Sequence, residues 1–240
     1  MTKAALRDLA CRANRRLADT GLVHGTFGNV SAVDRKAGTM AIKPSGVPYA
    51  RLRPSDMVLV SLASGRIADG RLRPSSDTPT HLELYRAFPS AGGVVHTHSE
   101  YATAFAQARL PIRCMGTTHA DYFRHDVPVT RPMTENEVTS NYERETGLVI
   151  VETFRDARLS PADVSAVLVA NHGPFVWGGD PFDAIERAEV LEYLARVEWR
   201  VRTLAPDAAR PDDFLVHKHH SRKHGPDAYY GQKGSGVNKR

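Results

Sequence analysis

Residues 92–99 read Gly92-Gly93-Val94-Val95-His96-Thr97-His98-Ser99, so two histidines follow an apolar run directly. Such a run is typical of a short buried strand that ends at the first histidine. On a strand, residues two apart point to the same face and lie ~6.5 Å apart along the chain. This spacing lets two imidazoles converge on one metal ion with bonds of ~2 Å. Because two ligands do not complete a catalytic metal site, the other ligands must come from elsewhere in the chain.

The composition favours one domain with a sizeable core. The chain has 240 residues, of which 41% are hydrophobic. We expect a single catalytic domain over residues 1–232 and a flexible polar tail over 233–240. No apolar run approaches the ~20 residues of a membrane span, and the N-terminal residues lack a signal-peptide pattern. Two cysteines, Cys11 and Cys114, form no metal or redox motif, which is typical of a reduced, cytoplasmic protein.

The charge balance bears on the class of partner. The formal net charge is +5, which is compatible with nucleic acid, with a phosphorylated small substrate or with simple solubility. The basic residues are spread along the chain, with few aromatic residues between them until the end. This distribution argues against nucleic-acid binding.

Hydrophobic periodicity predicts helices alternating with short strands. Strands are expected at 30–33, 40–42, 57–62, 93–96 and 166–170, and helices at 5–17, 78–88, 99–107, from 134, at 180–202 and at 212–222. We expect Thr78 to cap its helix with Pro79 at the first helical position, and Thr134 to form a capping box with Glu137. The second and third strands are joined too closely for a crossover helix. The pattern therefore predicts an α/β fold with a mostly antiparallel central sheet flanked by helices.

A third histidine, His172, follows another short apolar run and precedes a Gly-Pro turn. Loops at strand ends are where folds commonly place functional side chains. With His96 and His98 it would form the three-histidine set of catalytic zinc sites, which leave one position open for substrate. Imidazole ligands also suit cobalt, manganese or nickel. The alternative is that each histidine is a hydrogen-bonded core or surface residue.

Three short clusters resemble anion sites. Ser75 and Ser76 precede a predicted helix, Lys43 stands two residues before Ser45-Gly46, and Gly28-Asn29 follows a Gly-rich turn. Hydroxyl groups and backbone N–H groups at a helix N-terminus bind phosphate, and glycine lets the backbone approach closely. Each cluster alone could be an ordinary turn. Together with a metal set, they favour a phosphorylated substrate.

Three further residues could handle protons or metal. Asp77 could be a metal ligand or a general base, or it could cap the helix that follows. Asp121 is a second candidate carboxylate, although by residue type alone a surface position fits it better. Tyr230 could give and take a proton, or pack in a C-terminal arm. The His- and Lys-rich run at 217–224 is interpreted as a solvated basic helix rather than a metal site.

Several motifs together are similar to those of the class II aldolase/adducin family. They are Gly-Asn-Val-Ser-Ala-Val-Asp-Arg (28–35), Ile-Lys-Pro-Ser-Gly-Val (42–47), Pro-Ser-Ser-Asp-Thr-Pro-Thr-His (74–81), His-Thr-His-Ser (96–99), Gly-Thr-Thr-His-Ala-Asp-Tyr-Phe (116–123) and His-Gly-Pro-Phe (172–175). The resemblance runs from the first helix to Gln232 and leaves out the tail. It implies a three-layer class II aldolase-like fold.

The resemblance also implies roles for individual residues. A divalent metal, usually Zn²⁺ but also Mn²⁺ or Co²⁺, would be held by His96, His98 and His172, with Asp77 at or beside it. Substrate and phosphate would be bound by Gly28, Asn29, Lys43, Ser45, Gly46, Ser75 and Ser76. Asp121 and Tyr230 would be the acid/base pair. The family's epimerases are homotetramers with sites between subunits, and they act on small phosphorylated sugars in pathways such as arabinose catabolism.

The resemblance leaves a choice of activity. The block at 116–123 and the aspartate at position 77 favour an epimerase that breaks and remakes the carbon 3–carbon 4 bond of a pentulose 5-phosphate. Sugar-phosphate aldolases of the family typically carry glutamate at the position of Asp77 and lack that block. An adducin-like scaffold domain is the third alternative, but such domains lose the metal-binding histidines.

Overall fold

The computed structural model describes residues 1–224 and 228–229. Its described part contains a seven-stranded sheet in which every neighbouring pair is antiparallel, in the order β4-β3-β2-β1-β5-β7-β6. The strands are β1 Asn29–Asp34, β2 Thr39–Ile42, β3 Val58–Ser61, β4 Ile67–Asp69, β5 Gly93–His96, β6 Ala166–Leu168 and β7 Pro174–Gly178. The predicted α/β class and antiparallel sheet are confirmed.

Seven α-helices lie in the described part of the chain, with two short 3₁₀ turns, Tyr49–Arg51 and Pro54–Asp56. The helices are α1 Lys3–Ala18, α2 Thr78–Ala87, α3 Glu100–Ala108, α4 Thr117–Ala120, α5 Glu135–Asp156, α6 Pro181–Leu204 and α7 Asp213–His224. Thr134 and Glu137 form the expected capping box of α5. The expected cap of α2 is wrong: Asp77 occupies the N-cap position, and Thr78 is already helical. None of the helices described is long and apolar enough to cross a membrane.

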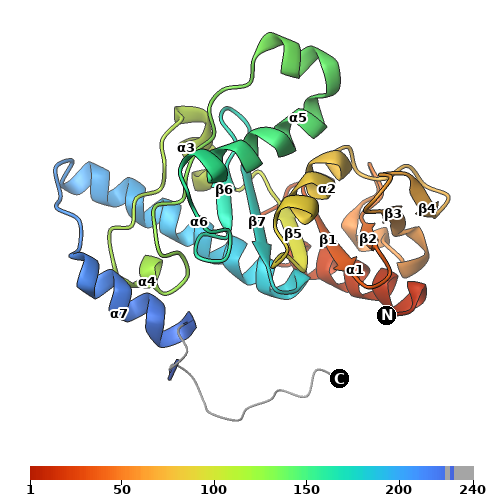
Figure 1. Ribbon diagram of the computed structural model, residues 1–240, viewed down its shortest axis with the longest axis horizontal. Helices are drawn as coiled ribbons and strands as arrows, with labels where there is room; N and C mark the ends of the chain where they lie inside the picture. Colours follow the sequence, from red (N-terminus) through yellow and green to blue (C-terminus); the bar gives the residue numbers. More distant parts are fainter. Residues whose placement is uncertain (225–227, 230–240) are drawn as a thin grey trace.

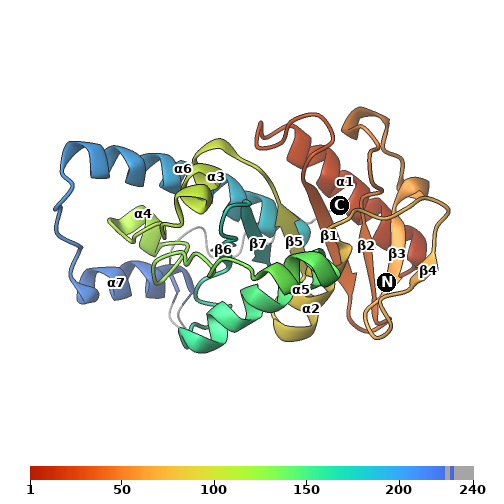
Figure 2. The same cartoon turned by 90° about the horizontal axis from the view of Figure 1, so that it is seen from above.

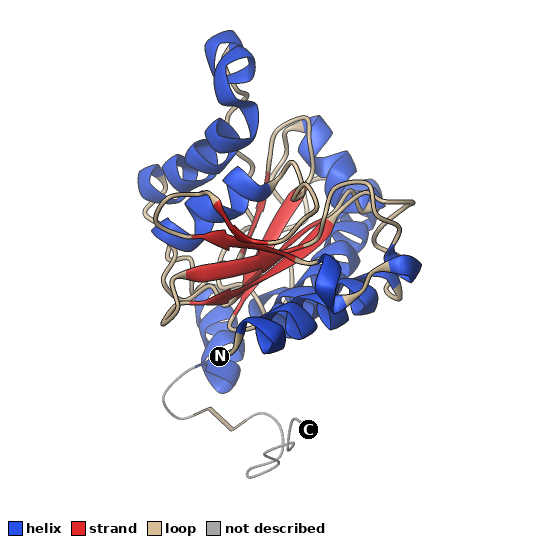
Figure 3. Cartoon of the chain, turned by 90° about the vertical axis from the view of Figure 1, so that its right-hand side faces the viewer, coloured by secondary structure: helices blue, strands red, loops and turns tan. Residues whose placement is uncertain are grey.

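Helices pack on both faces of the sheet (Figure 3). Strand alternation sends Val95 of β5 toward α1, α3 and α6, and sends its neighbour Val94 toward α2 and α5. The same alternation in β7 places Val176 on the face covered by α1, α3 and α6, and places Phe175 and Trp177 on the face covered by α2 and α5. Because β5 is buried on both faces, its position in the sheet is fixed, and so is the place where it ends at His96.

The last helix, α7, packs against α4 and lies away from the sheet (Figures 1 and 2). Two predicted features fall outside the described residues: Tyr230 and the tail 233–240.

Candidate metal centre and anion-binding cavity

The structure brings His96, His98 and His172 together. His96 is the last residue of β5, His98 follows it by two residues, and His172 lies in the loop between β6 and β7. One nitrogen from each imidazole lies within 4.8 Å of the other two, so the group could hold a metal ion. The Nε2 atoms of His96 and His98 are 3.2 Å apart. Strands β5 and β7 pair directly, which explains why residues distant in the chain meet here.

The chemistry of the three imidazoles fits a divalent metal. His96 donates its Nδ1 hydrogen to the Pro174 carbonyl oxygen at 3.0 Å, which leaves Nε2 with its lone pair facing the group. Burial lowers the pKa of His172 to about 4, and the neighbouring His96 and His98 act in the same direction. His172 is therefore neutral at physiological pH, the form that ligates metals.

Asp77 lies beside the histidines, with its carboxylate turned into the site. Although it occupies the N-cap position of α2, its side chain makes no capping hydrogen bond. Instead Oδ2 accepts a hydrogen bond of 2.6 Å from the Asn29 amide. Burial raises the pKa of the Asp77 carboxyl, but the nearby His96 and His81 and the hydrogen bond from Asn29 together lower it by more. The pKa of Asp77 therefore lies below its usual range. Asp77 is therefore ionised at neutral pH.

All the residues predicted to bind substrate line one cavity with the histidines and Asp77. Its volume is about 390 Å³, and the predicted members are Gly28, Asn29, Lys43, Ser45, Gly46, Ser75, Ser76, Asp77, His96, His98 and His172. Two backbone hydrogen bonds of 2.9 Å, from Ser45 N to Arg73 O and from Ser75 N to Lys43 O, join two of the clusters that were predicted to bind an anion. The clusters thus form one wall rather than separate turns.

Gly28 is required by its surroundings. Its φ is +76°, and a Cβ at this position would lie 2.8 Å from the carbonyl oxygen of His96 and 2.7 Å from Val23 Cγ1. Any other residue would push on the backbone of β5 at His96.

Lys43 carries the positive charge of the cavity wall and is only 2% exposed. Its Nζ donates to the Thr26 carbonyl oxygen at 3.2 Å and lies 4.8 Å from the centre of the Tyr49 ring. Burial lowers the pKa of Lys43, and the negative charge of Asp77 partly opposes this. An anion in the cavity would satisfy this buried ammonium group.

Of the predicted acid/base pair, Asp121 is not among the described residues that line this cavity. Asp121 ends α4, where Arg222 of α7 donates to both of its carboxylate oxygens at 2.9 and 2.6 Å. His219 Nδ1 lies 3.2 Å from Asp121 Oδ1. Burial raises the pKa of Asp121, but Arg222 and His219 outweigh it and lower the pKa. Tyr230 lies outside the described residues.

Thr26 and Phe27, from the Gly-rich turn before Gly28, also line the cavity, and sequence reasoning missed two further lining residues, Tyr142 and Glu143. The last two follow Asn141, whose non-helical angles (φ −142°, ψ 71°) kink α5. The only signal in the sequence is Asn141 itself, a residue type that is unfavourable inside helices.

The family of this chain follows from a comparison of its sequence with models of known families. The chain belongs to the family of the class II aldolase and adducin N-terminal domain, whose model matches residues 8–199. This confirms the resemblance at the level of the family.

Several solved structures are similar over almost the whole chain. An L-fuculose 1-phosphate aldolase is 26% identical, with a TM-score of 0.75 over 91% of this chain and 97% of that one. YgbL from Klebsiella pneumoniae, a candidate aldolase/epimerase/decarboxylase, is also 26% identical, with a TM-score of 0.71 over 92% of this chain and 100% of that one. The L-fuculose-1-phosphate aldolase of Thermus thermophilus is 27% identical, with a TM-score of 0.66 over 87% of this chain and 100% of that one.

Proposed function

We propose that the protein is a metal-dependent L-ribulose-5-phosphate 4-epimerase, which interconverts L-ribulose 5-phosphate and D-xylulose 5-phosphate. The observation that carries this proposal is one cavity that joins a three-histidine group to a buried lysine and a serine-rich wall. Asp77 and the block at 116–123 direct it toward epimerisation. Arabinose catabolism is the expected setting.

The ligand set proposed for the metal is His96, His98 and His172, with Asp77 beside them. Zinc is the expected ion, and manganese or cobalt would suit the same donors. When bound, the metal would supply a Lewis acid that stabilises negative charge on substrate oxygens by several kcal/mol.

The chemistry follows from the substrate and the residues. Carbon 4 bears no acidic hydrogen because the carbonyl is at carbon 2, so direct deprotonation there is unfavourable. Removing the proton of the carbon 4 hydroxyl instead lets the carbon 3–carbon 4 bond break, with its electron pair passing to an enediolate of carbons 1–3. The other fragment is glycolaldehyde phosphate. When its carbonyl turns over and the enediolate adds to the opposite face, carbon 4 is inverted.

The cavity wall has a defined task in this scheme. Lys43, Ser45 and Ser75 would hold the phosphate, so that the aldehyde turns about the carbon 4–carbon 5 bond without leaving the site. Asn29 keeps its amide nitrogen on Asp77, while its buried Oδ1 accepts no hydrogen bond from the described residues.

The proposed acid and base are Asp121 and Tyr230 of a neighbouring subunit in a homotetramer. One removes the carbon 4 hydroxyl proton, and the other returns a proton after the aldehyde has turned. This arrangement is supported by the position of Asp121, which does not line its own chain's cavity. It is also supported by exposed apolar side chains on α6, where Trp199 and Leu204 are 51% and 85% exposed.

A sugar-phosphate aldolase is the second candidate, favoured by the likeness to two L-fuculose 1-phosphate aldolases. The two activities are separated by incubating purified, metal-loaded protein with L-ribulose 5-phosphate and identifying the products. An epimerase forms D-xylulose 5-phosphate. Accumulation of dihydroxyacetone and glycolaldehyde phosphate without the epimer would establish cleavage instead, and no reaction with this sugar would exclude the proposed substrate.

The substitution Lys43→Met is expected to raise KM for the sugar phosphate by about 10- to 100-fold, the value of one charge-assisted hydrogen bond. Steady-state kinetics on both substrates measure the effect, with exposed Lys36→Met as the control.

Because burial lowers the pKa of Lys43, this lysine loses its positive charge at a lower pH than an exposed lysine does. The wild-type KM should therefore begin to rise at a lower pH than it would with an exposed lysine. In Lys43→Arg this alkaline rise should be absent. A Lys43→Met protein with an unchanged KM would remove Lys43 from the phosphate site.

A further inference from the structure

The imidazole of His172 is held by a side chain rather than by the backbone. Its Nδ1 lies 2.9 Å from the hydroxyl oxygen of Tyr142. The two rings are nearly parallel, with an angle of 13° between planes and 6.1 Å between centroids. In contrast, the Nδ1 of His96 donates to the carbonyl oxygen of Pro174. A substitution can therefore remove the partner of His172 without touching the backbone.

Tyr142 directly follows the residue at which α5 kinks. Its carbonyl oxygen accepts a 2.8 Å hydrogen bond from the hydroxyl of Thr146, a residue that is only 1% exposed. The turns of α5 before Asn141 stand away from the body (Figures 1 and 3). Helix α5 then packs along α2 through buried Ile150 and Phe154. Tyr142 thus begins the packed part of the helix, and its hydroxyl contacts His172 from there.

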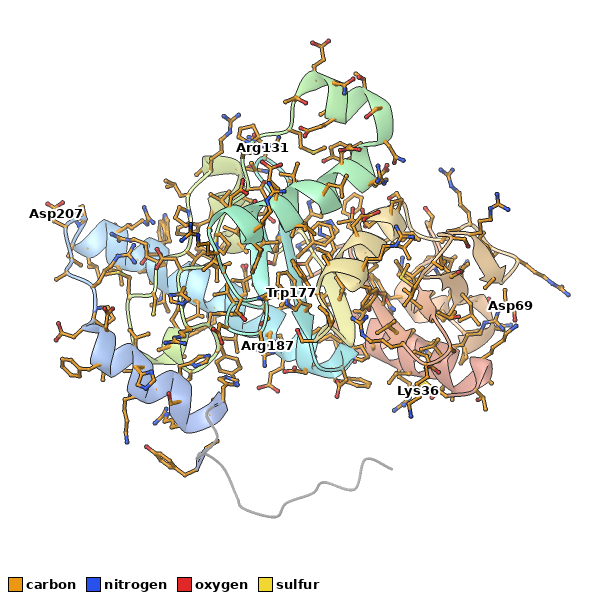
Figure 4. The ribbon with its side chains drawn as sticks, in the orientation of Figure 1. Lys36, Asp69, Arg131, Trp177, Arg187 and Asp207 are labelled. Atoms are coloured by element: carbon orange, nitrogen blue, oxygen red, sulfur yellow. The ribbon has the colours of Figure 1, made fainter. Side chains whose placement is uncertain are left out.

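An ion-pair network bridges the kink. Arg131, labelled in Figure 4, donates to Glu137 in the projecting turns of α5 and to Glu152 in its packed part, at 2.7 and 2.8 Å. The network ties both parts of α5 to the same guanidinium group.

We propose that Tyr142 is a positioning residue that fixes the ring and the tautomer of His172 for metal binding. The inference rests on the proposed metal centre and deepens it. With Nδ1 engaged by Tyr142, Nε2 is the nitrogen left for the metal, so Nδ1 carries the hydrogen and donates it to the phenolic oxygen. Without that acceptor, the ring is free to rotate or to take the other tautomer, and both compete with metal binding. The hydrogen of the phenol then remains available to donate into the cavity, which Tyr142 lines.

The substitution Tyr142→Phe tests the inference, because it keeps the ring and removes the hydroxyl. Metal-free protein is titrated with Zn²⁺ in competition with a chromophoric chelator. We expect Tyr142→Phe to bind about 10- to 100-fold more weakly than wild type. The control is Tyr101→Phe on α3, whose ring packs on Trp199 and which does not line the cavity. Its affinity should equal that of wild type.

A double-mutant cycle separates positioning from a general structural effect. In a His172→Asn background, the change Tyr142→Phe should have no further effect on zinc affinity, because the hydroxyl has lost the ring it positions. A full additional loss in that background would show that Tyr142 acts elsewhere and would overturn the inference.

Imidazole ¹⁵N NMR of the zinc-loaded wild type gives a readout that does not depend on a variant. His172 should show a protonated Nδ1 and a metal-bound Nε2, and coordination through Nδ1 would overturn the inference. Equal zinc affinity of Tyr142→Phe and wild type would overturn the role of Tyr142 while leaving the metal centre intact. Failure of wild type to bind any divalent metal would instead overturn the proposed centre, and the role of Tyr142 with it.

Discussion

The substitution His98→Asn should remove metal and activity together. His98 Nε2 lies 3.2 Å from His96 Nε2, and the side chain is exposed to the cavity, so the change removes a donor without opening the core. Losing one of three imidazoles weakens metal binding, and the Lewis acid contributes several kcal/mol. Since 1.36 kcal/mol is tenfold in rate, we expect kcat to fall by ~10³-fold. Metal content by mass spectrometry and kcat are measured on the same sample.

The matched control for this change is His24→Asn, at an exposed histidine that does not line the cavity. It should keep both metal and activity. Full metal occupancy with wild-type kcat in His98→Asn would contradict the assignment of the three-histidine group. Loss of metal with retained activity would show that the reaction does not need a metal at the three-histidine group.

Tyr230→Phe should leave folding and metal content intact and reduce epimerisation by about 10²- to 10⁴-fold, the usual contribution of a positioned acid or base. The reason is chemical: phenylalanine keeps the ring but cannot exchange a proton with the carbon 4 oxygen. The effect is measured as kcat in both directions, with zinc content determined on the same protein. The control is Tyr229→Phe at the preceding residue, whose ring is 54% exposed beside Lys218.

Mixing the two inactive variants tests whether a site is shared between subunits. If Tyr230 acts in a neighbour's site, hybrids of His98→Asn and Tyr230→Phe contain some sites with both a complete metal group and an intact tyrosine. Activity should therefore return on co-refolding. Wild-type rates in Tyr230→Phe alone would assign Tyr230 to packing of the C-terminal arm, and no recovery in hybrids would place both residues in one chain's site.

Local sequence patterns were sufficient to predict much of the sheet and the three histidines that the structure brings together. Strand β5 is present with the predicted bounds, because its short apolar run fits a strand that is buried on both faces. Strand β7 was missed. Its Pro-Phe-Val-Trp-Gly run begins with proline directly after His172-Gly173, which suggested a turn. Proline is tolerated there because it is the first strand residue.

Other features depend on contacts that local patterns do not encode. Strand β4 is only three residues long and mostly exposed, so it has little hydrophobic signal. The contact between Tyr142 and His172 requires α5 to lie beside the loop between β6 and β7. Likewise, the pairing of Asp121 with Arg222 spans 101 residues and depends on how α7 packs against α4.

The most direct test of the proposed reaction is epimerisation of L-ribulose 5-phosphate by metal-loaded protein in D₂O, followed by NMR of the products. Cleavage and re-addition never break the bond between carbon 4 and its hydrogen. We therefore predict D-xylulose 5-phosphate that carries no deuterium at carbon 4, without accumulation of dihydroxyacetone or glycolaldehyde phosphate. Deuterium at carbon 4, or the two fragments in place of the epimer, would contradict the account.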